Sequence, residues 1–295
     1  MAIEQEKLNA QCFVKRKIKS VFSGENHPEL LYVCRILPDA SEHPRIMHSH
    51  SDFVEISLIF EGKSQYYIGD SHYDVEKGDL IIYNAGVVHD ENSGPDNKVG
   101  HFCIAIAGLR MPGLEENQMI SKEAGYVFKT EKDFEQMSSL CQMMFEALAE
   151  DEARAELFCH GLMRAFLSKV LNVIERNTDV EMEQPLDDYP VLSQQIKEYI
   201  DEHFWEQVTL QTIGEALHIS PYYIGHVFKK ATGYSPMQYV QRRRIGEAQT
   251  LLINTELSIV EIAGMLGYDS QSHFNVQFTK QVGMPPKKYR KNYVV

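Results

Sequence analysis

The sequence contains one helical pattern twice between Thr209 and Pro286. Ile213 and Leu217 of the first copy recur as Ile262 and Leu266, at an offset of 49 positions. Five later positions match at an offset of 50, because the second copy has one extra residue in its turn. Ile224, Phe228, Lys230, Gly233 and Pro236 correspond to Phe274, Phe278, Lys280, Gly283 and Pro286. A repeat of this detail means that one supersecondary unit is used twice.

Each copy is predicted to form two short helices joined by a tight turn. The apolar residues recur at helical spacing. Polar caps precede the helices, and they are Thr209, Ser220, Ser258 and either Asp269 or Ser270. Ser258 and Glu261 have the spacing of a capping box, and Pro221 follows Ser220 at a favourable first helical position. Gly233 and Gly283 are predicted to end the second helix of each copy.

A longer helix is predicted between the copies, from Ser235-Pro236 to about Asn254. Repeated helix pairs also occur in solenoids, where they serve only as packing units. Here there are two copies rather than a stack, and the connecting helix carries Arg242, Arg243 and Arg244. These features favour DNA binding over a solenoid.

Many spaced residues in the last hundred positions resemble the signature of the AraC/XylS family of bacterial transcription regulators. They are Ala248, Leu251, Leu252, Ser258, Ile259, Ile262, Ala263, Gly267, Tyr268, Phe274, Phe278, Gly283, Pro286, Tyr289 and Arg290. The resemblance covers about residues 190–295. It implies an all-α domain of seven helices, in which the second helix of each unit enters the major groove. The two helices would then read successive groove segments ~34 Å apart.

Carried over position by position, the resemblance implies a set of DNA-binding residues. The base-facing ones are Tyr222, Gly225, His226, Gln271, Ser272, His273 and Val276, and the phosphate contacts are Lys229, Lys230 and Lys280. Most family members have arginine where His226 and Val276 stand, and usually lysine at the position of Thr279. Since arginine to guanine is the commonest specific contact, Gln271 becomes the clearest direct reader, with adenine as its partner. For Tyr222 and His273, ordinary surface exposure is the alternative.

The net charge of −13 is unevenly divided along the chain. Residues 190–295 hold 11 Lys+Arg and 9 Asp+Glu, whereas residues 1–189 hold 18 and 33. The first part therefore repels DNA, and the second must gather its cations on one face. We expect a protein with two tasks, whose DNA affinity falls steeply with salt.

The expected compartment is the cytoplasm. Residues 1–19 are polar and mixed in charge, unlike a signal peptide, and we expect no membrane span. The five cysteines contain no C-x-x-C pair and precede the repeat; they are Cys12, Cys34, Cys103, Cys141 and Cys159. A scattered, odd set fits a reducing compartment better than a disulfide framework.

The first half, to about Gly108, is predicted to be β structure. Alternating segments separated by turn residues predict strands at 53–60, 65–68, 72–75, 80–83 and 99–107. Short strands at this spacing are typical of a small antiparallel barrel or jelly roll. The expected fold class is therefore α+β, with a barrel over residues 1–130.

Within this half, a second set of residues resembles the two motifs of the cupin barrel. His48, His50, Glu55 and Gly62 fit the first motif, and Gly78, Asp79, Gly86 and His89 follow the second. The second motif departs from the pattern at Asn84, where proline is usual. In metal-binding cupins the positions of His48, His50, Glu55 and His89 hold a divalent ion, and such ligands suit Fe, Mn, Ni, Cu or Zn.

Sensor barrels fused to this kind of DNA-binding tail often keep the same pattern without a metal, so no cofactor is required. The barrel interior around these residues is expected to bind a small effector. Its candidate residues are His48, His50, Glu55, His89, Arg45 and Tyr83, with Tyr66 and Tyr67 as further wall residues. The family's effectors include sugars, which makes a sugar the leading expectation.

Residues 131–178 are predicted to form two helices with apolar residues at three- and four-residue spacing. They can either pack on the barrel or, as the family resemblance implies, form a homodimer interface. The acidic stretch 179–189 lacks an apolar face and is expected to be a linker. Residues 190–295 follow as the DNA-binding half, with Trp205 expected in its core.

The resulting hypothesis is a sequence-specific transcription regulator controlled by an effector in the barrel. Activation is the commoner outcome in the family, with RNA polymerase as the further contact that it implies. Two alternatives stay open, namely a metal-dependent cupin enzyme with an accessory DNA-binding tail and an architectural DNA binder with a vestigial barrel.

Overall fold

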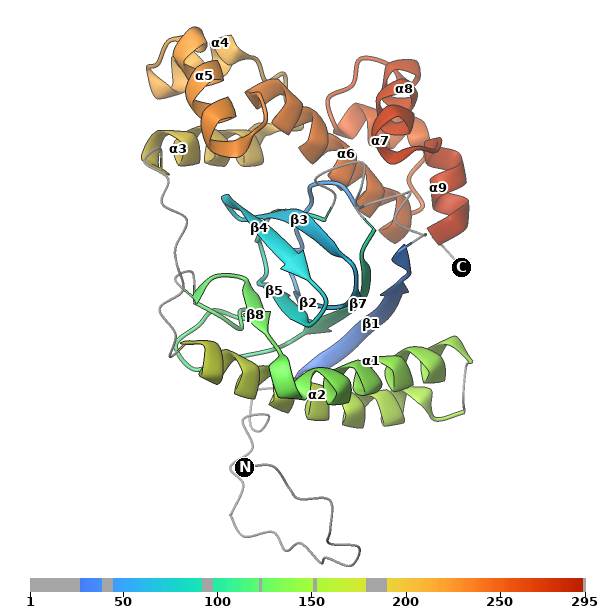
Figure 1. The fold of residues 1–295 in the computed structure, drawn as a ribbon. Helices are drawn as coiled ribbons and strands as arrows, with labels where there is room; N and C mark the ends of the chain where they lie inside the picture. The colour runs from blue at the N-terminus through green and yellow to red at the C-terminus, as the bar shows by residue number, and fades with distance from the viewer. Residues whose placement is uncertain are drawn as a thin grey trace, which may run out of the picture.

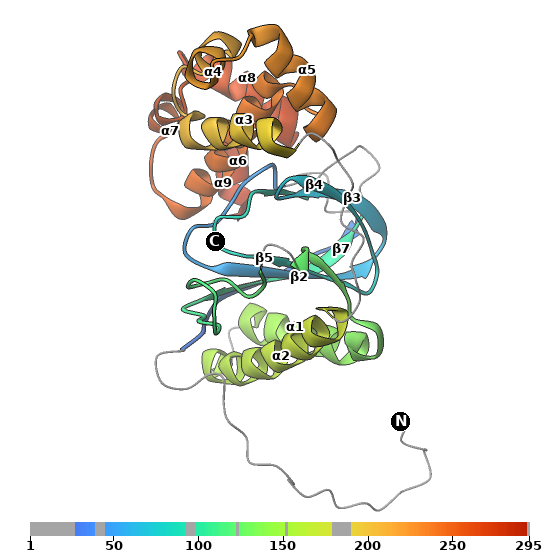
Figure 2. The ribbon, with the colours of Figure 1, turned by 90° about the vertical axis from the view of Figure 1, so that its left-hand side faces the viewer.

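The computed structural model describes residues 27–38, 45–91, 98–121, 124–150, 153–178 and 190–293. The predicted linker 179–189 and Cys12 lie outside the described residues. Figure 2 shows three layers, with two helices on one side, a β-barrel in the middle and a helical half on the other side.

The barrel consists of two antiparallel sheets. The larger sheet has the order β1 (Glu29–Ile36), β7 (Gly100–Ala107), β2 (Val54–Glu61), β5 (Asp79–Tyr83) and β8 (Val127–Lys129). The smaller sheet has the order β4 (Ser71–Glu76), β3 (Lys63–Ile68) and β6 (His89–Asp90). The predicted α+β class and antiparallel barrel are confirmed. All five predicted strands are present, whereas β1, β6 and β8 were not predicted.

Two helices cover the outer face of the larger sheet, as Figure 1 shows. They are α1 (Phe134–Ala149), preceded by a short 3-10 turn at Glu131–Asp133, and α2 (Ala155–Thr178). Alternate strand residues such as Ile56 and Ile104 pack against Met137 and Phe166 in one buried cluster. By length and composition alone, α2 is long and apolar enough to cross a membrane, which by itself is weak evidence for a span. Several of its side chains, including Phe166, lie in this buried cluster.

The region 190–293 contains seven helices, the number that the resemblance implied. They are α3 (Pro190–His203), α4 (Leu210–Leu217), α5 (Pro221–Thr232), α6 (Pro236–Asn254), α7 (Ile259–Met265), α8 (Gln271–Val282) and α9 (Pro286–Tyr293). The predicted pairs are α4–α5 and α7–α8, connected by α6.

The ends of these helices follow the predicted cap chemistry. The hydroxyls of Thr209, Ser220 and Ser258 accept hydrogen bonds from backbone N–H groups in the first turns of α4, α5 and α7. Ser270, not Asp269, caps α8. Gly233 and Gly283 end α5 and α8 at φ of 76° and 81°, where side chains are unfavourable.

The prediction that Trp205 packs in the core was wrong. Phe204 takes the buried position after α3, with the Arg243 guanidinium 4.8 Å from its ring centre. Trp205, the next residue, is 46 % exposed. Helical periodicity ends at His203, so the face of a residue beyond it could not be obtained from the spacing.

The smaller sheet separates the barrel interior from the helical half. Side chains alternate between the two faces of a strand. In β3, Tyr66 packs inside the barrel, while Tyr67 joins the buried cluster of the helical half and meets Tyr234 edge to face. In β6, His89 lies with the barrel histidines, while the carboxylate of Asp90 accepts a 2.9 Å hydrogen bond from Arg242 of α6.

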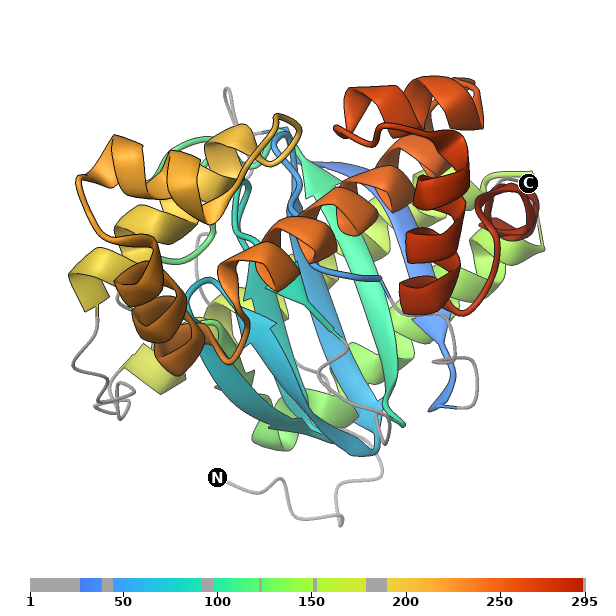
Figure 3. The same cartoon turned by 90° about the horizontal axis from the view of Figure 1, so that it is seen from above.

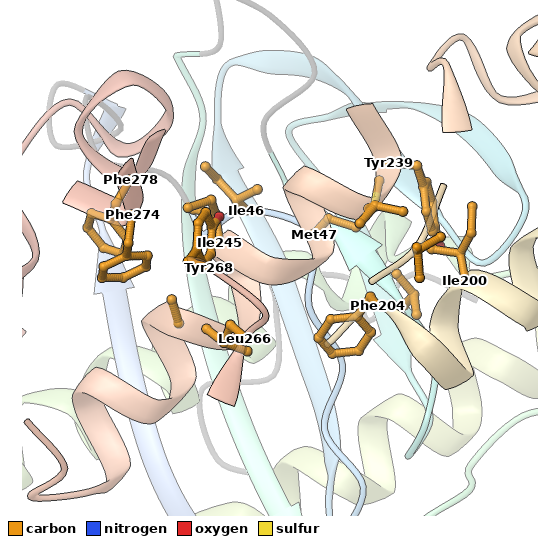
Figure 4. Packing of buried hydrophobic residues seen from close by; sticks show 14 of the residues in the cluster. Ile46, Met47, Ile200, Phe204, Tyr239, Ile245, Leu266, Tyr268, Phe274 and Phe278 are labelled. Carbon is orange, nitrogen blue, oxygen red and sulfur yellow. The ribbon is translucent and has the colours of Figure 1, made fainter. Parts of the chain in front are cut away.

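Helix α6 lies directly on barrel residues 45–47, as Figure 3 shows from above. The amide of Ile46 donates to the Gln249 side chain at 2.9 Å, and Arg45 donates to the Thr250 hydroxyl at 3.2 Å. Ile46 and Met47 are buried among side chains of the helical half (Figure 4). We call this contact between segment 45–47, the smaller sheet and the helical half the seam.

The seam extends to both sides of α6. Near the first pair, His72 of β4 contacts the Thr232 carbonyl at the end of α5 at 3.3 Å, and Lys197 of α3 pairs with Asp70 at 3.0 Å. On the other side, Arg45 and Tyr289 of α9 are joined by a hydrogen bond. The barrel therefore contacts the helical half on both sides of α6.

Gly246 allows α6 to approach the barrel so closely. A Cβ atom at Gly246 would lie 2.1 Å from the Met47 carbonyl oxygen, a backbone atom that no rotamer change can move. Alanine is otherwise the better helix residue, by about 1 kcal/mol.

Gly246→Ala is therefore expected to open the seam. The Ile46 amide, which donates across it, should exchange faster, and hydrogen–deuterium exchange of peptides covering residues 45–49 measures this. Gly264→Ala in α7 is the matched control, because nothing lies within 4 Å of its added Cβ. Equal exchange at 45–49 in both variants would contradict the close contact.

Candidate ligand pocket and nucleic-acid interface

The four residues of the cupin-like pattern meet in the barrel. The ligand atoms of His48, His50, Glu55 and His89 all lie within 4.8 Å of one another. His48 and His89 face each other through a pair of 2.9 Å backbone hydrogen bonds, and Glu55 lies on β2. Residues from separate segments thus form one buried cluster, which we call the histidine–glutamate cluster.

Backbone carbonyls orient two of the imidazoles. Nδ1 of His48 lies 3.1 Å from the Ile46 oxygen, and Nδ1 of His89 lies 3.0 Å from the Val87 oxygen. A carbonyl oxygen only accepts, so Nδ1 carries the proton and Nε2 presents a lone pair. A carbonyl oxygen that accepts from the other ring nitrogen in this way commonly fixes the orientation of a metal-binding histidine.

The Glu55 carboxylate faces these nitrogens. Its oxygens lie 3.3 Å from Nε2 of His50 and 3.7 Å from Nε2 of His89, and it accepts a short hydrogen bond from the Tyr32 hydroxyl. Within the described residues, Nε2 of His50 and of His89 are buried without a hydrogen-bond partner. A buried lone pair opposite a carboxylate is unfavourable unless a cation or a donor lies between them.

Burial sets the protonation of the cluster. Burial, followed by the nearby Arg45 charge, holds the pKa of His48 well below its usual value, and burial also lowers the pKa of His50. Burial alone would raise the pKa of Glu55, but the facing His50 and His89 side chains hold it well below its usual value. A deprotonated imidazole nitrogen and an ionised carboxylate are the forms in which these side chains bind a divalent cation.

Further polar atoms line the barrel interior. The Tyr83 ring stacks on His89 with centres 3.9 Å apart, and its hydroxyl is buried without a partner among the described residues. Ser57 Oγ, two residues beyond Glu55 on β2, is also buried without a hydrogen-bond partner among the described residues. Several buried polar atoms that converge without partners are typical of a ligand pocket.

Two predicted wall residues lie elsewhere. Tyr67 points to the helical half, because it alternates with Tyr66 along β3. Arg45 lies in the seam, where it contacts α6 and α9. The sequence reasoning also missed Tyr32 and Ser57. Ser57 could have been found from its alternation with Glu55, whereas Tyr32 lies on the unpredicted strand β1.

The predicted DNA-binding residues lie on the recognition helices α5 and α8. Tyr222 is 87 % exposed and Val276 is 63 % exposed, and most of the others are also exposed, with Gly225 half-buried. Buried side chains such as Phe228 and Phe274 occupy the opposite faces. Figure 1 shows both helix pairs on the side of α6 away from the barrel.

The three arginines of α6 bind groups within the protein and do not form a basic surface. Arg242 pairs with Asp90, Arg243 donates to Asp201 at 2.7 Å, and Arg244 donates to the Phe204 and Gly267 carbonyls. Their use as evidence for DNA binding was therefore wrong. Exposed cations lie instead at the predicted Lys229, Lys230 and Lys280 and, not predicted, at Lys287 and Lys288 of α9.

Comparisons with known proteins agree with this two-part architecture. Residues 30–167 match the AraC-like ligand binding domain, and residues 213–292 match a helix-turn-helix domain. The chain is 26 % identical to the uncharacterized HTH-type transcriptional regulator YdiP of Escherichia coli, across 83 % of this chain and 81 % of that protein. It is 23 % identical to the HTH-type transcriptional activator RhaS of an Enterobacter species, across 82 % and 86 %.

Among solved structures, the helical half is similar to the C-terminal domain of AraT, a response regulator from Geobacillus stearothermophilus. The identity is 33 %, the match covers 37 % of this chain and 91 % of that one, and the TM-score is 0.36. Both relatives that match most of the chain are transcriptional regulators, which argues against the alternative of a metal-dependent enzyme. The chain belongs to the AraC family of DNA-binding transcription regulators.

Proposed function

We propose that this regulator reads promoter DNA with α5 and α8, and that a small molecule in the barrel controls it. The observation that carries the proposal is the different setting of two sets of side chains. Most of the predicted readers are exposed to solvent on α5 and α8, while buried polar atoms without hydrogen-bond partners lie inside the barrel. The expected outcome is activation in the cytoplasm, with RNA polymerase as a further partner.

The reading residues differ in the contacts that they can make. Gln271 begins α8 and is exposed, so its amide can bond adenine. Tyr222, Gly225, His226, Ser272, His273 and Val276 are the other proposed base contacts. Lys229, Lys230 and Lys280 are the proposed phosphate contacts, which position the helices without reading sequence.

The pocket chemistry supports a polyhydroxylated effector such as a sugar. The histidine–glutamate cluster and the Tyr83 and Ser57 hydroxyls offer both donors and acceptors. A sugar presents several hydroxyls that can satisfy such groups together.

A divalent metal is a second candidate occupant of the same cluster. His48, His50, Glu55 and His89 would hold it, since their donor atoms lie close together and suit a borderline cation. Bound there, it would act as a Lewis acid that anchors effector oxygens. The chain's own contribution is to orient the imidazoles through the Ile46 and Val87 carbonyls.

The seam gives the effector a route to the DNA-binding half. His89 and Asp90 are neighbours that point to opposite faces, toward the pocket and toward Arg242. His48 likewise adjoins Met47, which is buried against α6. A ligand that displaces either histidine therefore acts on α6, provided that it binds one arrangement of the seam more tightly than another.

A homodimer through the α1–α2 layer is the proposed assembly. Leu157 is 73 % exposed on α2, and Phe158 and Met143 are also exposed apolar side chains in this layer. Exposed apolar groups on one surface favour a partner there.

Substitution of Gln271 tests the DNA-reading assignment. Gln271→Ala should weaken binding to an operator selected from random DNA by about tenfold, because one bidentate base contact is lost. Fluorescence anisotropy measures the affinity, and binding to unrelated DNA should stay unchanged. Gln195→Ala, a change at an exposed glutamine of α3, is the control. An equal loss on both DNAs would contradict a base contact.

Removal of the Glu55 carboxylate tests the metal candidate. Protein purified without a histidine tag and resupplied with divalent ions should hold about one equivalent by elemental analysis, and Glu55→Gln should lose most of it. His27→Ala, an exposed histidine outside the cluster, should retain it. Less than about a tenth of an equivalent in the unmodified protein would exclude the metal but not the sugar, which a thermal-shift screen tests separately.

Charge placed on the α1–α2 layer tests the dimer. Leu157→Asp should shift the mass in solution scattering from dimer to monomer, because a buried carboxylate without a partner is costly. Leu37→Asp, at an exposed apolar site after β1, should stay dimeric. A monomeric mass for the unmodified protein at micromolar concentration would rule out the assembly.

A further inference from the structure

A cleft lies between the barrel and the helical half, and His50 of the histidine–glutamate cluster is one of its lining residues. Its volume is about 670 Å³, comparable to sites for drug-sized molecules. Four segments line it, namely the loop 49–53 before β2, the end of α3, one face of α6 and the end of α7. Each half of the protein therefore supplies part of the wall.

Helix α6 both contacts the barrel and lines the cleft. Gly246 and Gln249 face barrel residues 46–47. The cleft is lined by an adjoining stripe at helical spacing, which contains Arg243, Glu247, Thr250, Leu251 and Asn254. Thr250 also accepts the hydrogen bond from Arg45 in the seam, so the cleft directly adjoins the seam.

Large apolar side chains are exposed to solvent in the cleft. Trp205 lines it while almost half exposed, and Met265 of α7 lines it at 54 % exposure. On the barrel side, Phe53 is stacked on His50 with ring centres 4.2 Å apart, which fixes its position. Two aromatic rings and a thioether from separate segments form a surface suited to the apolar body of a ligand.

The ionisable groups of the cleft are mainly acidic. Its wall contains three carboxylates and one guanidinium. Asp201 is neutralised by Arg243 at 2.7 Å and by Lys197 at 3.5 Å. The remaining carboxylates, Asp52 and Glu247, come from opposite halves and leave the cleft with a negative charge.

We propose that this cleft binds an organic cation with an aromatic or apolar body, such as an aryl ammonium compound. Its charge would lie between Asp52 and Glu247, and its apolar body would lie against Trp205 and Met265. Cations are attracted both to carboxylates and to aromatic faces, most strongly to tryptophan.

Such a ligand would act on regulation, a consequence that rests on the proposed function. Because both halves line the cleft, an occupant stabilises the arrangement in which they meet. It therefore favours whichever DNA-binding state has this arrangement, independently of the effector in the barrel.

Trp205 is the only tryptophan of the chain, so its fluorescence reports on the cleft directly. We expect benzyltrimethylammonium to change the emission of the full-length protein in a saturable way. The anion 3-phenylpropionate, of similar size, should bind about tenfold more weakly or not at all. No saturable change with the cation, or an equal response to the anion, would overturn the proposal.

Two variants locate the binding. Glu247→Gln should weaken the cation about fivefold, and Asp52→Asn should act similarly from the barrel side. Glu135→Gln on α1, beyond the opposite face of the barrel, is the matched control and should leave the affinity unchanged. Unchanged affinity in both cleft variants would place the probe elsewhere and overturn the assignment.

The same titration is then repeated with operator DNA present. A shift in cation affinity on adding DNA supports the regulatory consequence. If the cation binds as predicted but DNA leaves its affinity unchanged, the cleft stands as a ligand site and its regulatory role is refuted. Failure of DNA binding itself would instead count against the proposed function.

Discussion

The structure depends on the alternation of side chains in one small sheet. Successive residues of β3 and β6 point into the barrel and onto the helical half, so that a single strand contributes to two environments. The most constrained contact is between Asp90 and Arg242. Asp90 is fully buried, and a buried carboxylate that lost its cation would cost several kcal/mol. This pair therefore holds α6 against the barrel more firmly than a surface ion pair could.

Much of the helical half could be predicted from the sequence. Serine and threonine caps, C-terminal glycines and apolar spacing are local signals, and they located the helix pairs. The roles of Arg242, Arg243 and Arg244 could not be obtained in this way. Their partners, Asp90, Asp201 and the carbonyl of Phe204, come from distant segments, and charge alone does not distinguish a DNA contact from an internal one.

In the barrel, too, some features could be predicted from the sequence and others could not. Spacing brought His48, His50, Glu55 and His89 together correctly, because their motif encodes the turn and strand that carry them. Arg45 was assigned to the pocket but lies in the seam, and Tyr32 was missed. Strand β1 has no clear alternation, with five of its eight residues half-buried, so its pairing with β7 only appears once the sheet is assembled.

The contacts of the barrel on both sides of α6 have a consequence for modularity. His72 contacts the end of α5, Asp70 contacts α3 and Arg45 contacts α9, so the barrel braces the helical half on both sides of α6. A helical half transplanted onto another sensor would lose these contacts unless segment 45–47 and the β3–β4 hairpin travelled with it. Divergence of operator spacing within such regulators would then require paired changes in both halves.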